Sequence, residues 1–176
     1  LGIILYGFRL TFQNIIDVGG PAILVDVLVV LTTIMGGVYV GKLLKMDKEV
    51  ALLTSVGSGI CGAAAILGAE ATIKTKPYNT AVAVSTVVIF GTISMFLYPI
   101  LYRNGIIAFT PDQMGIYTGA TLHEVAHVVG AGNAMGKEIS DVAVIVKMIR
   151  VMLLVPALLF ISLSVVQRGK TASGEG

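Results

Sequence analysis

One short stretch of the chain, residues 116–135, carries the side chains best suited to chemistry. It reads IYTGATLHEVAHVVGAGNAM and holds both histidines of the protein, His123 and His127, together with Glu124. Two histidines four residues apart share one face of a helix. H-E-x-x-H is also the pattern in which zinc metallopeptidases bind zinc through the histidines and use the glutamate as general base. An intramembrane zinc protease, with zinc on His123 and His127, is therefore one interpretation.

The zinc interpretation lacks a third ligand, which such a site requires. The available carboxylates, Asp26, Asp112 and Asp141, lie in no recognisable metal-binding context. We therefore keep the protease as an alternative and expect a protein that is not an enzyme and has no cofactor or resident metal.

Composition indicates that the bilayer is the solvent of this chain. Hydrophobic residues make up 56% of it, charged residues 12%, and the mean hydropathy is +0.92. These values are typical of a polytopic membrane protein and far from those of a soluble domain. The 12 basic residues form no cluster, which argues against a nucleic-acid partner. With Cys61 as its one cysteine, the chain can form no internal disulfide.

Long apolar runs predict the elements that must position the motif. Residues 22–44 and 80–102 are each long enough to cross about 30 Å of hydrocarbon, and a last helix is expected from Val142 to about Val166, after Ser140 or Asp141 as N-cap. We expect an all-α polytopic membrane bundle over residues 1–167, as a fragment of a longer multi-pass protein. A disordered tail is expected over residues 168–176.

Glycine is concentrated in two of the remaining segments. Residues 57–62 read GSGICG, and five glycines are spread over residues 115–136. Glycine weakens a helix by about 1 kcal/mol per site relative to alanine. The pattern predicts two discontinuous helices, broken near Gly57–Gly62 and near Gly130–Gly136, whose breaks approach each other as in carriers with half-helices at the bilayer midplane.

Half-helix N-termini meeting in a membrane would form an anion site. Lys147 and Arg150 lie too far inside their helix to reach water easily, so we expect them to pair with Glu124 or Asp26, although Asp26 could equally be interfacial. An entering anion would compete with Glu124 for these cations, and protonation of Glu124 would free them. Cys61 is expected to be a buried small hydrophobe rather than a reactive thiol. The expected translocation residues are Ser58, Gly59, Cys61, Gly62, Thr121, His123, Glu124, His127, Lys147 and Arg150.

Several long phrases are similar to a known family. LGIILYGFRLTF, GSGICGAAAIL, VAVSTVVIFGTISMFLYP, MGIYTGATLHEVAHVVGAG and AVIVKMIRVMLLVP resemble, in this order, the YeiH-type family of bacterial inner-membrane proteins, to which sulfate export is ascribed. The resemblance covers nearly the whole chain. It implies the middle half of a longer protein and a fold similar to inverted-repeat carriers. Where the family is expected to read HEVAQ, this chain has His127, which implies a polar lining residue there and disfavours zinc.

Together, these features predict a secondary carrier in the bacterial inner membrane. Its expected partners are the lipid bilayer, a small inorganic or organic anion such as sulfate, and a proton or sodium ion for coupling; an oligomer is compatible with this. The alternatives from other classes are the intramembrane zinc protease and a membrane scaffold that transports nothing.

Overall fold

The computed structural model describes residues 12–172, with side chains described for residues 23–163. This part of the chain is helical and contains no strand. The helices are α2 (Phe12–Leu43), α3 (Lys48–Gly59), α4 (Ala63–Ile73), α5 (Pro77–Arg103), α6 (Pro111–Thr121), α7 (Val125–Met135), α8 (Lys137–Met152) and α9 (Leu154–Ala172). The all-α class predicted from the sequence is confirmed.

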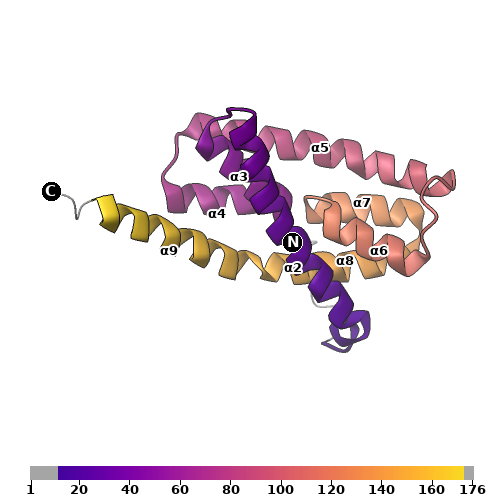
Figure 1. Ribbon diagram of the computed structural model, residues 1–176. Coiled ribbons are helices and arrows are strands. Elements are labelled where there is room, and N and C mark those ends of the chain that lie inside the picture. The colour runs from indigo at the N-terminus through magenta and orange to yellow at the C-terminus, as the bar shows by residue number, and fades with distance from the viewer. Residues whose placement is uncertain (1–11, 173–176) are drawn as a thin grey trace.

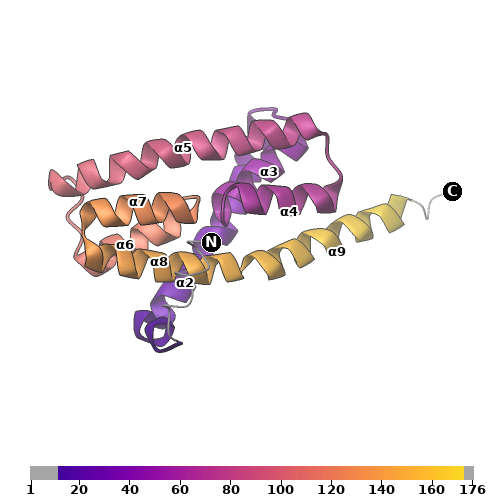
Figure 2. The same cartoon turned by 180° about the vertical axis from the view of Figure 1, so that it is seen from behind.

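Two long rods enclose the shorter helices. Helix α5 runs along one side and the α8–α9 rod along the opposite side, with α4 and α7 between them (Figures 1 and 2). Within the part of the chain that the structure describes, three stretches are long and apolar enough to cross a membrane: Ile23–Leu43, Pro77–Arg103 and Lys137–Leu163. A 27-residue helix is roughly 40 Å long, which exceeds the hydrocarbon thickness and permits tilt. Large apolar side chains such as Phe90 and Phe96 face outward, as a lipid-facing surface requires. The structure is a polytopic membrane bundle.

The first interruption lies between α3 and α4. The chain leaves the helix at Ile60 and re-enters it at Ala63, with Gly62 as N-cap at a φ of 72°. Only glycine adopts this conformation without strain. A Cβ on Gly62 would also lie 2.5 Å from Cγ of Glu124. The interruption therefore falls at the C-terminal end of the glycine-rich segment in which it was predicted.

The second interruption, at residues 122–124, lies outside the range predicted for it, although α7 does end within that range, at Met135 directly before Gly136 with its φ of 140°. Helix α7 runs through Gly130 and Gly132, so the break expected near Gly130 is wrong. These glycines serve close packing instead: a Cβ would lie 2.7 Å from Met95 Sδ at Gly130 and 2.7 Å from the Ser140 Cα at Gly132. The chain is interrupted at residues 122–124, between α6 and α7, where Leu122 and Glu124 are extended.

The last rod also begins earlier than predicted. Helix α8 starts at Lys137, directly after Gly136 at a φ of 140°, and not after Ser140 or Asp141. Met152 ends α8 and Leu154 begins α9, whose Pro156 lies in the first turn, where its missing N–H leaves no hydrogen bond unmade. Helix α9 is described to Ala172, within the stretch expected to be a disordered tail. Residues 173–176 lie outside the described part.

Glycines also bring α6 and α8 into backbone contact. A Cβ on Gly119 would collide with the Ala143 carbonyl oxygen and lie 2.8 Å from the Val146 Cβ. We expect Gly119→Ala to destabilise the protein by about 1–3 kcal/mol, because a backbone carbonyl cannot move aside cheaply. Thermal unfolding of the purified full-length protein measures this. Gly36→Ala is the control, since Gly36 meets no described atom within 4 Å; equal midpoints for the two variants would contradict the expectation.

Candidate functional site

Helix α8 holds the two interruptions together through Arg150. Its Nε donates to the Gly59 carbonyl oxygen at 2.7 Å and Nη2 to the Ser58 carbonyl oxygen at 3.2 Å, both at the end of α3. Its Nη1 donates to the Ala120 carbonyl oxygen at the end of α6. The side chain is 1% exposed. One guanidinium therefore bridges two half-helices that are far apart in the sequence.

Lys147 makes the same kind of bridge one turn earlier. Its Nζ donates at 2.7 Å to the carbonyl oxygen of Ile60 and at 2.7 Å to that of Leu122. The carbonyls at a helix C-terminus lack intrahelical partners and carry the negative end of the helix dipole. Lys147 and Arg150 therefore cap the C-terminal ends of α3 and α6 together, with charges suited to that end.

These contacts correct the pairing predicted from the sequence. Among the described residues, a basic and an acidic side chain lie within ion-pair distance only at His127–Glu124 and at Lys137–Asp141, so neither Lys147 nor Arg150 pairs with Glu124 or Asp26. The unpaired carbonyls at two helix ends provide enough acceptors to satisfy both cations. The premise that Glu124 holds these cations is therefore wrong, and so is the coupling scheme built on it.

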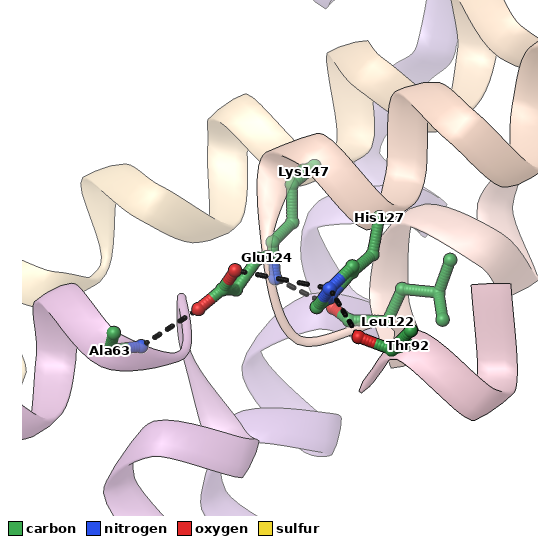
Figure 3. Close-up of polar contacts among 6 residues, drawn as sticks. All are labelled: Ala63, Thr92, Leu122, Glu124, His127 and Lys147. Carbon is green, nitrogen blue, oxygen red and sulfur yellow. Dashed lines mark hydrogen bonds and ion pairs between the residues drawn. The ribbon is translucent and has the colours of Figure 1, made fainter. Parts of the chain in front are cut away.

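Glu124 lies instead at the opposite, positive ends of the half-helices. It is the N-cap residue of α7, and its Oε1 accepts a hydrogen bond from the backbone N–H of Ala63, the first residue of α4, at 3.4 Å (Figure 3). The carboxylate thus contacts the N-terminal end of α4 and belongs to the residue that precedes α7, although its side chain makes no cap hydrogen bond to α7. A negative charge at a helix N-terminus is stabilised by about 0.3–1 kcal/mol, and by up to about 2 kcal/mol in a partly buried position. The Glu124 side chain keeps 26% of its surface exposed, so it can be reached from outside.

His127 lies beside Glu124, against α5. Its Nε2 is 3.4 Å from Thr92 Oγ1 and 4.0 Å from Glu124 Oε2 (Figure 3). Gly91 makes room for the ring, because a Cβ there would lie 2.6 Å from His127 Nδ1. The histidine therefore connects the carboxylate to the long helix α5.

The zinc interpretation requires the two histidines to share one face of a helix, and they do not. His123 precedes α7, which begins at Val125, and its Nδ1 lies 3.3 Å from the Thr121 carbonyl oxygen. Within the described residues, no group of three His, Cys, Asp or Glu side chains is placed to hold a metal ion. The geometry therefore does not favour the protease alternative.

Purified full-length protein should accordingly contain no stoichiometric zinc. We also expect His127→Gln to fold normally, since a glutamine amide can still hydrogen-bond to Thr92. Elemental analysis and thermal unfolding measure the two results. A zinc content close to one ion per chain that disappears in His123→Ala would contradict this expectation and restore the protease interpretation.

The two interruptions, residues 60–62 and 122–124, together form what we call the crossing. The remaining predicted residues divide between its two sides. Ser58 and Gly59 take part through their backbone carbonyls at the C-terminal side, while Gly62 gives Glu124 its space at the N-terminal side. Cys61 is buried and free, as expected of a small hydrophobe. The Thr121 hydroxyl donates to the Tyr117 carbonyl and accepts from the Tyr98 hydroxyl at 3.0 Å.

The sequence interpretation missed two residues of α5 and misjudged a third residue on α2. Thr92 and Tyr98 contact His127 and Thr121, and the only local signal for Thr92 was the Gly91–Thr92 pair inside an apolar span. Asp26 is 0% exposed, so its interfacial interpretation is wrong. It looked interfacial because the apolar run begins at residue 22, but helix α2 begins at Phe12, roughly 20 Å earlier.

Comparison with known proteins places the chain in a family. A family model described as "Conserved hypothetical protein 698" matches residues 1–176. The chain belongs to this family. A UPF0324 membrane protein of Bacteroides thetaiotaomicron is 72% identical over the whole chain, which covers 52% of that protein. UPF0324 membrane protein WS2204 of Wolinella succinogenes is 51% identical, over 99% of this chain and 53% of the relative.

The UPF0324 inner membrane protein YeiH of Escherichia coli K12 is 48% identical, over 99% of this chain and 50% of the relative. The YeiH-type resemblance is thus confirmed, and with three membrane-capable helices the chain is assigned to the bacterial inner membrane. The chain spans about half the length of the curated relatives that it matches. No solved structure matches it.

Proposed function

We propose that the protein is part of a secondary carrier that exports a small anion, such as sulfate, across the inner membrane. The observation that supports this is the position of Glu124, which lies between the N-terminal ends of α4 and α7 and accepts a hydrogen bond from Ala63. This position already accommodates an anionic group of the protein itself. A free anion of similar charge would meet the same helix ends and backbone N–H groups.

The charges around the crossing favour an anion over a cation. Lys147 and Arg150 add two buried positive charges and neutralise the negative ends of α3 and α6, which would otherwise repel an anion. Among the described side chains, Glu124 is the acidic group at the positive ends of α4 and α7. If Glu124 swings outward from its partly exposed position, the field left at the crossing is positive. The entering anion would thus replace the carboxylate at Ala63.

Interrupted helices also suit a carrier better than a scaffold. Backbone that leaves the helix inside a membrane must be satisfied by protein or line a cavity. Here, side chains of α8 satisfy the carbonyl ends, and a partly exposed glutamate accepts from the first amide of α4. A static scaffold has no need for either device.

Radiolabelled sulfate flux into proteoliposomes that contain the full-length protein tests the proposal. We expect protein-dependent uptake that unlabelled sulfate competes away and that protein-free liposomes lack. If neither sulfate nor any of a panel of small inorganic and organic anions moves, the carrier proposal fails, and a non-transporting membrane scaffold becomes the better account.

A further inference from the structure

A carboxylate that the proposed anion site does not use lies inside the bundle. Asp26 of α2 is 0% exposed, and both of its carboxylate oxygens lack a hydrogen-bond partner among the described residues. Its neighbour Val25 packs against Ala120 of α6 and Val146 of α8. Asp26 therefore lies beside the crossing of the interrupted helices and not at the membrane surface.

The charged groups that face Asp26 are the two cations of α8. Arg150 and Lys147 interact with it electrostatically, and the other described helices packed on α2, namely α3 and α6, place no charged group beside it. Neither cation donates a hydrogen bond to it, since their donors are directed at the carbonyl ends of α3 and α6. The carboxyl group thus interacts electrostatically with two cations and is hydrogen-bonded to neither.

An ionised carboxylate cannot remain in such a place without cost. Removing one from water costs several kcal/mol unless hydrogen bonds or an ion partner compensate, and a group left without them becomes neutral instead. A sodium ion would need several oxygen ligands in addition to Asp26, which carriers supply from unwound backbone carbonyls, and the described carbonyls at the ends of α3 and α6 already accept from Lys147 and Arg150. A proton needs no further ligand.

We propose that Asp26 is the site at which the protein binds its coupling proton. In the conformation described, the group is a carboxylic acid with the proton on one of its oxygens. When the ends of α3 and α6 separate and Arg150 releases the carbonyls of Gly59 and Ala120, Asp26 is the adjacent carboxyl group available to it. The O–H bond then breaks, the proton leaves to water, and the carboxylate pairs with the guanidinium. The reverse movement takes up one proton.

This arrangement makes the two states of Arg150 mutually exclusive. The guanidinium caps the helix ends while Asp26 is protonated, or pairs with Asp26 after the proton has left. Proton binding would thereby be linked to the conformation of the crossing. The coupling of this proton to transport rests on the proposed carrier function, whereas the protonation of Asp26 does not.

Infrared spectroscopy of the purified full-length protein over a descending pH series tests the proposal without any transport assay. The wild type should show the C=O stretching band of a protonated carboxylic acid with few hydrogen bonds. The band should be lost in Asp26→Asn, shifted but retained in Asp26→Glu, and unchanged in Glu124→Gln. Thermal unfolding of each variant verifies the fold. A wild type without the band, or a band that persists in folded Asp26→Asn, overturns the assignment.

Proteoliposomes with an imposed pH gradient then test the coupling. We expect the gradient to drive sulfate accumulation above equilibrium by the wild type and not by Asp26→Asn. If the sulfate flux of the wild type does not depend on the pH gradient, coupling at Asp26 is overturned and the carrier proposal stands. An infrared band at Asp26 without any anion flux would overturn the proposed function, and the coupling with it, and leave only the protonated site.

Discussion

Arg150→Met is expected to destabilise the protein more than any other single substitution considered. Methionine fills a similar length but donates no hydrogen bond, so the carbonyls of Ser58, Gly59 and Ala120 are left without this partner in the protein interior. Each orphaned buried acceptor costs about 1–3 kcal/mol. We therefore expect a loss of about 3 kcal/mol or more, measured as a lower midpoint in thermal unfolding of the full-length protein in detergent.

Lys137→Met provides the matched control on the same helix. It also replaces a cation by methionine, but Lys137 is 87% exposed and its 2.6 Å ion pair with Asp141 lies at the surface, where such pairs contribute about 0–1 kcal/mol. Arg150→Lys should fall between the two, since lysine keeps the charge but not the fork geometry. If Arg150→Met and Lys137→Met unfold at the same temperature, the cation does not hold the crossing together.

Glu124→Gln is expected to strengthen sulfate binding about tenfold. The carboxylate and the anion compete for the same helix N-termini, and a neutral amide competes less because it gains little from the dipoles. A charge at such an end is worth up to about 2 kcal/mol, and tenfold corresponds to about 1.4 kcal/mol. Equilibrium binding of labelled sulfate to the purified full-length protein measures the change.

Glu138→Gln controls for the loss of a negative charge as such. Glu138 is exposed in the first turn of α8, whereas Glu124 lies at α7 and contacts α4. We expect its sulfate affinity to match that of the wild type. Weaker or unchanged binding by Glu124→Gln would show that the carboxylate and the anion do not share a position.

The sequence predicted the elements that depend on local pattern. The span expected at residues 80–102 corresponds to α5 (Pro77–Arg103), because an uninterrupted apolar run leaves the chain no other stable arrangement in a bilayer. The first interruption was predicted because glycines are concentrated at Gly57–Gly62, and one of them, Gly62, adopts a positive φ that glycine accommodates without strain. Both the span of α5 and the first interruption are determined by residue types within the segment itself.

The features that sequence reasoning missed depend on distant partners. The second interruption contains no glycine: Leu122 can leave the helix because its carbonyl oxygen accepts from Lys147, a residue on another helix. Gly130 and Gly132 resembled helix breakers but make room for Met95 and Ser140. Lys147 and Arg150 were expected to find carboxylates, because the sequence does not show which backbone carbonyls tertiary structure leaves free.

An experimental structure of the full-length protein with bound selenate tests the central claim most directly. Selenate mimics sulfate, and its selenium can be located by anomalous scattering. We expect one selenate between the N-terminal ends of α4 and α7, near the N–H of Ala63, with the Glu124 carboxylate displaced and Lys147 and Arg150 still on the carbonyls of the interrupted helices. Selenate bound elsewhere, with Glu124 still accepting from Ala63, would contradict it.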